Sequence, residues 1–403
     1  MDKRLYYEDA YCTRFTAQVA ERLTLKGKPA VRLSRSAFYP TSGGQPHDTG
    51  RLGGTGVVDV QVGADGAVLH VLAEPLPDGT ASVSGEIDWS RRYDHMQQHS
   101  GQHLLSQVFF RRLGLETVSV HFGDALNTVD LDGPPLSAAQ LADVETAANG
   151  LVWENRPIRA YWVDEEAREK VPLRRAPAVA GATRIVEIDK FDWSACGGTH
   201  VRRTGEIGLI ALVRVEKHRG RSRVHFVCGR RALGDAARRR GLLAEAAGLL
   251  DSGVDDVPEL VSKQQEALRA VERELKALRE GLVGYQAREL LAEAEIAGGV
   301  RLVAEALIES EPAAVQVLAR ALIAEPSVVA LLGCAQRGKG TVVFARSEDC
   351  SVHVGNLLRD TLREFGGGGG GRPDFAQGGG VAEEKLVDVL GAAAAVVRRE
   401  VGG

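Results

Sequence analysis

Short stretches of alternating apolar and polar residues fill the first part of the chain. Phe15, Ala17 and Val19 alternate with polar neighbours, which is the period-two pattern of a strand with one buried face. Further apolar stretches of this kind lie between Gly, Asp and Pro turns, at residues 31–33, 57–60, 68–71 and 81–87. Several short strands at such spacing predict an N-terminal β-barrel over residues 1–88.

The pattern changes after residue 88, where helices and strands follow one another. Met96, Leu105 and Phe109 share the apolar side of a predicted helix over 89–112, with Gly114 as its stop. A capping box, Ser137 to Gln140, opens a second helix that runs to about residue 154. We expect a hairpin at 117–131 and strands at 157–163, 184–188, 207–215 and 223–227. This mixture predicts an α+β domain over residues 89–230.

Residues 231–298 have a charged, helical pattern. Five apolar residues step along it by 3, 4, 3 and 4 positions: Leu268, Val271, Leu275, Leu278 and Leu282. Such steps are typical of a coiled-coil seam, here about two heptads long. The segment is either a helical linker or coiled-coil hairpin within one chain, or an element through which two chains form a homodimer.

Residues 299–403 form a predicted C-terminal α/β domain. Strands are expected at 300–304, 328–332 and 341–345, and helices at 312–325, 354–365 and 382–400. Two glycine runs, 366–371 and 378–380, flank Arg372. We interpret them as a loop, which is either flexible or lets backbone amides and Arg372 approach phosphate or ribose. The predicted fold class is therefore α+β multidomain, with a barrel, an α+β domain, a helical linker and a C-terminal α/β domain.

Composition narrows the class of protein. The chain has 403 residues, of which 44% are hydrophobic and 26% charged, as in soluble globular proteins with more than one core. Its net charge of −4 means that a nucleic-acid partner needs a local basic patch. Five scattered cysteines favour a reducing compartment, and we find neither a signal peptide nor a membrane-spanning apolar run. We expect a cytoplasmic protein with no membrane partner.

Two short motifs carry candidate metal ligands. HSGQH at 99–103 has two histidines four residues apart on a predicted helix, so both imidazoles project to one side. In CGGTH at 196–200, Cys196 and His200 flank a Gly-Gly-Thr loop. Two such pairs supply the four nitrogen and sulfur ligands that zinc prefers. His95 lies on the same side of the helix, so spacing alone does not decide which two histidines bind.

Basic residues gather after the second motif. The segment includes Arg202, Arg203, Arg214, Lys217, Arg219 and Arg221. In isolation such residues are as well explained by a solvated surface. Beside a metal site in an acidic chain, they favour contact with phosphates.

Three motifs together resemble a known family. HSGQH with CGGTH resembles the zinc-binding editing domain of alanyl-tRNA synthetase and its freestanding relatives, the AlaX proteins. FYPTSGGQPHDTG at 38–50 is similar to the glycine loop of the β-barrel that precedes that domain. GGGGGGRPDFAQGGG at 366–380 resembles the signature of the DHH-associated domain that ends alanyl-tRNA synthetase. The motifs stand in the family's order and the resemblance covers nearly the whole chain.

The resemblance implies roles for individual residues. His99, His103, Cys196 and His200 would hold the cofactor, zinc (Zn2+), while His95 matches no ligand position and would lie behind the ligands. Gly43, Gly44 and Gln45 would lie near the editing pocket, and Thr199 of CGGTH is expected to bind substrate. His121 lies in a family-like stretch, SVHFG; it is either a half-buried strand residue or a pocket wall, and the match does not decide.

The implied reaction is hydrolysis of the ester that joins serine or glycine to the 3′-terminal ribose of mischarged tRNA(Ala). The barrel begins within the first dozen residues, so we expect the long form of AlaX, without the aminoacylation domain. The partner would be the acceptor end of tRNA(Ala), with a homodimer formed through the helical segment or the C-terminal domain. Four protein ligands leave zinc no open position, so its role, catalytic or structural, stays open.

A competing interpretation is a non-catalytic tRNA-binding or synthetase-associated protein with a structural zinc. A zinc peptidase is disfavoured because HSGQH lacks the glutamate of the His-Glu-x-x-His helix. A full alanine–tRNA ligase is disfavoured because no aminoacylation domain is found.

Overall fold

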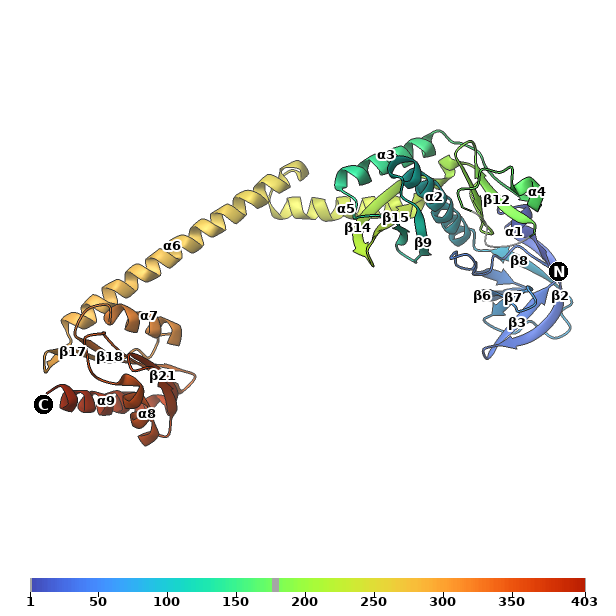
Figure 1. The fold of residues 1–403 in the computed structure, drawn as a ribbon. Helices are drawn as coiled ribbons and strands as arrows, with labels where there is room; N and C mark the ends of the chain where they lie inside the picture. The colour runs from blue at the N-terminus through green and yellow to red at the C-terminus, as the bar shows by residue number, and fades with distance from the viewer. Residues whose placement is uncertain (1, 176–180, 403) are drawn as a thin grey trace. The chain divides into compact units, whose positions relative to one another are not determined.

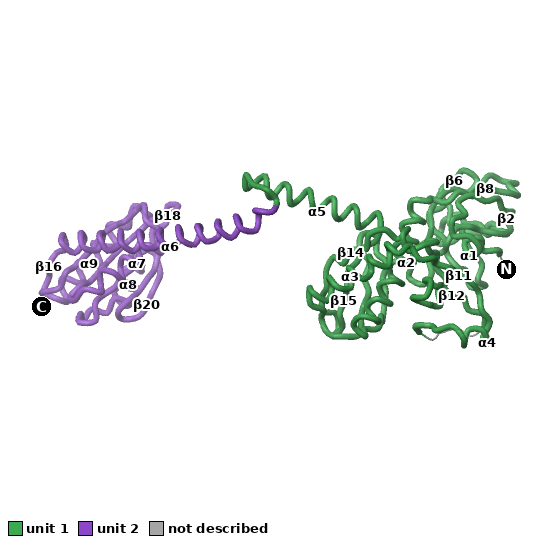
Figure 2. Tube along the Cα trace, turned by 90° about the horizontal axis from the view of Figure 1, so that it is seen from above, with its two compact units in different colours: residues 1–254 green, residues 255–403 purple. Residues whose placement is uncertain are grey.

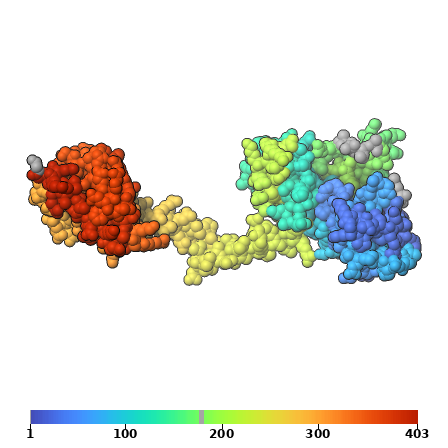
Figure 3. All heavy atoms as spheres, turned by 90° about the horizontal axis from the view of Figure 1, so that it is seen from below, coloured from blue at the N-terminus to red at the C-terminus, as the bar shows by residue number. Residues whose placement is uncertain are grey.

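The computed structural model describes residues 2–175 and 181–402. The chain divides into two compact units, residues 1–254 and 255–403 (Figure 2). The boundary falls inside the segment predicted as a helical linker. The first unit contains the barrel and the α+β domain, packed against each other (Figure 3).

The N-terminal strands pair into a closed barrel (Figure 1). Its strand order is β2 (Arg14–Leu25), β3 (Lys28–Leu33), β7 (Val68–Leu72), β6 (Thr55–Val62), β5 (Gly50–Leu52) and β8 (Ser82–Ile87). Apolar residues at alternate strand positions, such as Val31 and Leu33, are buried inside it. A parallel pair, β1 (Lys3–Arg4) and β4 (Arg35–Ser36), and a short helix, α1 (Leu5–Glu8), complete this part.

Helix α2 (Trp89–Leu113) is the centre of the α+β domain. The Asp88 side chain caps its first turn by accepting from the Arg91 backbone N–H, and Gly114, at φ 70°, ends it as predicted. Nearly every residue from His95 to Phe109 is buried, polar ones included. Because buried polar groups require partners, this helix must be surrounded by groups that hydrogen-bond it.

Two sheets pack around α2. One has the order β14 (Ile210–His218), β15 (Arg221–Cys228), β10 (Asn127–Leu131), β9 (Thr117–Phe122), and the other β11 (Ile158–Val163), β12 (Thr183–Ile188), β13 (Asp192–Ala195). The helices of this part are α3 (Ala138–Trp153), which has the predicted capping box, and α4 (Glu165–Arg168). The strand expected from residue 207 begins at Ile210, since Thr204–Ile207 form a 3-10 turn that the Thr204 hydroxyl anchors to the Leu151 carbonyl.

The linker segment is helical, as predicted. It consists of α5 (Gly229–Leu249), a short 3-10 turn (Val254–Asp256) and α6 (Val257–Ala292). The apolar residues of the predicted seam on α6 are exposed, from 46% for Leu275 to 65% for Leu278. None of the helices in the described part of the chain carries an apolar stretch of the length that a bilayer requires.

The second unit is built on a mixed six-stranded sheet. Its order is β16 (Glu295–Ala297), β17 (Val300–Ala306), β18 (Val328–Gln336), β19 (Lys339–Arg346), β21 (Phe375–Ala382) and β20 (Gly368–Gly371). Alternate residues of β18 enter two cores. Leu331 packs with α8 (Val354–Glu364) and α9 (Leu386–Val401), and Leu332 packs with α7 (Pro312–Leu322) and the end of α6. The last helix begins at Leu386 rather than 382, because Glu383–Lys385 form a 3-10 turn.

The glycine runs are not a loop, and this prediction was wrong. They form the antiparallel strands β20 and β21. A Cβ on Gly369 would come within 2.4 Å of the Gly378 Cα and 2.8 Å of the Leu358 side chain on α8. The missing side chains therefore let α8 and the neighbouring strand approach closely. Arg372 lies exposed in the turn and pairs with Asp374 at 3.1 Å.

Candidate metal centre

The four predicted ligands lie together. His99 and His103 come from α2, and Cys196 and His200 from the loop after β13; their ligand atoms are all within 4.8 Å of one another. The Cys196 Sγ is 3.4 Å from Nε2 of His99 and 3.4 Å from Nε2 of His200. Four ligands at the bond lengths of a tetrahedral zinc site are about 3.5 Å apart. The donor set and its spacing therefore fit zinc.

Each imidazole has a polar group beside its other nitrogen. Nδ1 of His99 is 2.8 Å from the Gln45 Oε1, and Nδ1 of His200 is 3.2 Å from the Ser100 hydroxyl. Nδ1 of His103 has no hydrogen-bond partner among the described residues, and the buried Asp192 carboxylate lies 3.6 Å from it, at ion-pair distance. Such partners fix the tautomer and leave Nε2 for a metal.

The surroundings of Cys196 favour the thiolate form, which can bind a metal. Burial alone would raise the pKa of Cys196, but the surrounding His99, His200 and His103 outweigh it and hold that pKa well below its usual range. The Gly198 N–H donates to the sulfur at 3.3 Å. Gly198 must be glycine, because a Cβ there would lie 2.2 Å from the His99 ring. A thiolate is the form in which cysteine binds metals.

Gln45 and Thr199 form hydrogen bonds beside the ligands and are not among the residues that line the cavity, so their contact with substrate stays a prediction. Both are buried. The Gln45 Oε1 accepts from the Thr199 N–H at 3.1 Å, and its Nε2 donates to the Thr199 hydroxyl at 2.7 Å. This network connects the glycine loop of the barrel to CGGTH and holds His99.

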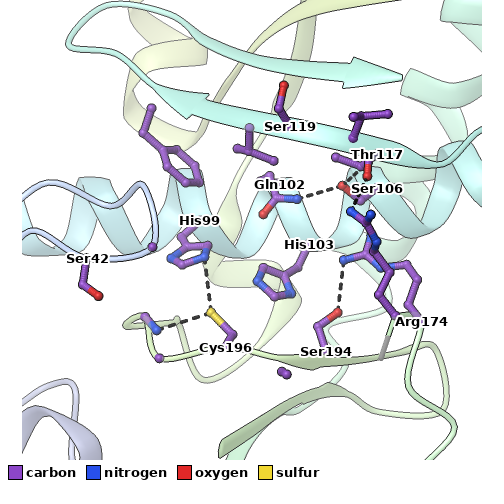
Figure 4. A pocket seen from close by; sticks show the side chains of 18 of the residues that line it. Ser42, His99, Gln102, His103, Ser106, Thr117, Ser119, Arg174, Ser194 and Cys196 are labelled. Atoms are coloured by element: carbon purple, nitrogen blue, oxygen red, sulfur yellow. Dashed lines mark hydrogen bonds between the residues drawn. The ribbon is translucent and has the colours of Figure 1, made fainter. Parts of the chain in front are cut away.

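A cavity of about 580 Å³ opens beside the ligands (Figure 4). Gly43 lines it, whereas Gly44, with φ +86°, packs toward the Phe122 ring. One wall carries a polar cluster in which the Gln102 Nε2 and the Thr117 hydroxyl each donate to the Ser106 hydroxyl at 2.7 Å. These groups can hydrogen-bond a small polar ligand next to the metal centre.

Two histidines lie outside this arrangement. His121 on β9 is exposed and is not among the residues that line the cavity, because strand alternation directs Val120 and Phe122 to it instead; of the two alternatives, this placement favours the strand residue. His95 is buried but is not among the clustered ligands. Burial lowers its pKa to about 4.

Most of the predicted tRNA-binding cations already have partners. Arg202 pairs with Asp9, Arg214 with Glu216 and Arg221 with Asp132, at 3.1, 3.8 and 3.6 Å. Arg203 donates to the Asn155 carbonyl. Lys217 and Arg219, at the β14–β15 turn, form no ion pair within residues 2–175 and 181–402. A role in tRNA binding stays a prediction for all of them.

Three residues at the centre were missed from the sequence: Ser100, Asp192 and Arg174. Ser100 lies inside HSGQH, so its place between two ligands was a usable signal. Asp192 and Arg174 have no local signal, because only the folded chain brings them beside His103 and the cavity.

Two regions match family models. Residues 183–225 match the threonyl and alanyl tRNA synthetase second additional domain, and residues 299–399 match the DHHA1 domain. The first match contains Cys196 and His200.

Known proteins resemble the chain along most of its length. The alanine–tRNA ligase of Archaeoglobus fulgidus is 32% identical over 397 residues, which are 96% of this chain but 42% of the ligase. The chain thus spans less than half of that relative. The alanyl-tRNA editing protein AlaX-L of Pyrococcus horikoshii is 29% identical over 401 residues, 96% of this chain and 97% of that protein.

Among solved structures, the C-Ala domain of Aquifex aeolicus alanyl-tRNA synthetase is 27% identical and covers 27% of this chain and 98% of that domain, with a TM-score of 0.24. The two domain matches and the likeness to AlaX-L along nearly all of both chains agree with the resemblance that the three motifs carry: the chain is similar to a long-form alanyl-tRNA editing protein.

Proposed function

We propose that the protein is a trans-editing deacylase that hydrolyses the ester of tRNA(Ala) mischarged with serine or glycine. His99, His103, Cys196 and His200 would hold Zn2+. One observation carries the proposal: four clustered nitrogen and sulfur donors lie beside a cavity with room for an aminoacyl group, and three of them line its wall. The likeness to AlaX-L supports the same reaction.

The cavity wall suggests how serine would be distinguished from alanine. Gln102, Ser106 and Thr117 offer an amide and two hydroxyls to a serine side chain. Alanine in the same place leaves such groups unpaired, at about 1–3 kcal/mol for each buried group. A cavity that admits serine cannot exclude alanine by size, so this wall accounts for the preference for serine over alanine only. A bound zinc supplies positive charge and a Lewis acid beside the ester.

The second candidate is a non-catalytic tRNA-binding protein. Four protein ligands complete a tetrahedral site, as in structural zinc centres. In that case the zinc would hold the loop after β13 to α2 and take no part in hydrolysis. Under either function, Lys217 and Arg219 are the basic residues that we favour for contact with the acceptor stem.

The two candidates differ in a deacylation assay. We would incubate the full chain with Ser-, Gly- and Ala-tRNA(Ala), as wild type, His103→Ala and His121→Ala. We expect serine and glycine to be released faster than alanine, and His103→Ala to slow release by more than about 100-fold and to lose zinc. His121 lies outside the cavity, so His121→Ala is the matched control and should keep both.

Release of serine and glycine no faster than in buffer, from protein with one zinc per chain, would favour the non-catalytic candidate. Equal release of alanine would contradict the proposed specificity.

A further inference from the structure

A largely buried arginine, paired on one side with Asp192, forms part of the cavity wall. Arg174 and Arg175 lie in the segment before β12, and both line the cavity. Figure 4 labels Arg174 there. The Arg174 side chain is 17% exposed. Glu116 is the one carboxylate among the residues that line this cavity. The two guanidinium groups therefore outnumber the one carboxylate on this wall, and the Cys196 thiolate belongs to the metal centre.

The hydrogen bonds of Arg174 leave donors unused. Its Nη2 donates to the Ser194 hydroxyl at 3.1 Å, and its Nε is 3.4 Å from the Asp192 Oδ1. Nε and Nη1 are buried and have no hydrogen-bond partner in the described part of the chain. A guanidinium has five N–H donors, and leaving buried charged donors unpaired is costly. The Asp192 Oδ1 beside Nε also lacks a hydrogen-bond partner, so those two groups can satisfy each other, and Nη1 is the donor left for an anion that enters the cavity.

The chemistry of the proposed substrate identifies that anion. In an ester of serine or glycine the α-carboxyl group is esterified, the side chain carries no charge, and the amino group is positive. The negative charges all belong to the RNA phosphates. Arg175, whose Nη1 donates to the Thr117 carbonyl, places a second cation beside the first. Guanidinium groups bind phosphates with charge-assisted hydrogen bonds.

We propose that Arg174, with Arg175 beside it, binds a backbone phosphate in the single-stranded 3′ end of the RNA and so sets the depth at which the ester enters the cavity. This inference rests on the proposed function for the kind of ligand. The amino group of the substrate would point away from this wall, because two guanidinium groups repel it.

The test measures binding rather than hydrolysis. Full-length wild type, Arg174→Gln and Arg174→Lys would be titrated with an uncharged RNA minihelix ending in CCA over a series of salt concentrations. We expect Arg174→Gln to weaken binding roughly 10-fold or more and to lower the slope of log Kd against log salt by about 0.7, the value of one single-strand phosphate contact. Arg174→Lys keeps the charge and should retain most of the slope. Arg14→Gln, an exposed barrel arginine, is the control and should change neither.

Replacing single RNA phosphates by uncharged groups shows which phosphate Arg174 contacts. Minihelices with a single methylphosphonate at each position of the CCA end would be bound to wild type and Arg174→Gln. At one position the two losses should not add, since both remove the same contact. Additive losses at every position, an unchanged salt slope, or no binding of the minihelix by wild type would overturn the proposal.

The zinc content of the Arg174 variants distinguishes phosphate binding from a purely structural role of this residue. Arg174 contacts Asp192, which faces the ligand His103, so a variant that loses zinc would show that Arg174 acts through that carboxylate, and the proposal would be wrong. If the phosphate coupling is found but serine and glycine esters are not hydrolysed, the proposed function fails while this contact stands.

Discussion

At the scale of single residues, the metal centre depends on side chains that never touch the cavity. Gln45 comes from the barrel, yet its Oε1 joins the Nδ1 of His99 to the backbone of Thr199. The sequence motif placed Gln45 near the site. A glutamine in a glycine loop gives the same sequence pattern whether it contacts substrate or hydrogen-bonds a metal-binding histidine. Its burial and its three hydrogen bonds favour the second role.

Gln45→Ala should therefore weaken zinc binding. Without the amide, the His99 ring loses the partner that fixes its tautomer, and loss of such a partner typically costs about 10- to 100-fold in metal affinity. Competition with a chromophoric chelator measures this directly. Ser42→Ala, in the same loop and on the cavity wall, is the control. Equal zinc affinity of Gln45→Ala and wild type would contradict the role.

At the scale of elements, local patterns predicted most helices and strands. The capping box at Ser137, the stop at Gly114 and the alternation of β2 and β3 are properties of a few neighbouring residues. The glycine runs were misread, because their strand pairing depends on how closely α8 approaches. The α6 seam is predicted correctly as helix, and its apolar residues are exposed in the single chain.

We expect that seam to pair with a second copy of the chain. The apolar steps of 3 and 4 are those of a coiled coil, and covering them removes exposed leucines from water. Sedimentation velocity of the full chain should show a dimer that the pair of changes Leu275→Glu and Leu278→Glu converts to monomer. Arg273→Glu, on the opposite side of the helix, should leave the dimer intact. A wild-type monomer at all concentrations would refute the expectation.

At the scale of the whole molecule, the four candidate metal ligands and the glycine hairpin belong to different compact units. The end of α6 belongs to the second unit, where Ala287 is buried in a core with Leu318 and Leu322 of α7. Truncating the chain at residue 300 would remove α7 and expose the α6 residues, such as Ala287, that pack against it. The natural place to divide the chain is thus the boundary at 254.

Removing residues 255–403 should weaken tRNA binding and leave zinc binding intact. A tethered second binding domain raises affinity through its effective concentration, so its loss should cost about 100-fold or more. Filter binding with tRNA(Ala) and metal analysis of both proteins measure the two effects. Unchanged tRNA affinity would show that the C-terminal domain takes no part in binding.

The sequence by itself determined which four side chains are the candidate ligands and most of the secondary structure. The HSGQH spacing fixes two imidazoles on one side of a helix, and CGGTH returns a thiol and an imidazole from one loop, because both depend on separations of a few residues. What only the tertiary structure decided are contacts between distant segments. Gln45 supports His99 across 54 positions, Asp192 faces His103 from β13, and Arg174 enters the cavity. Packing brings these groups together, and no local pattern in a single sequence encodes which buried polar group will meet which.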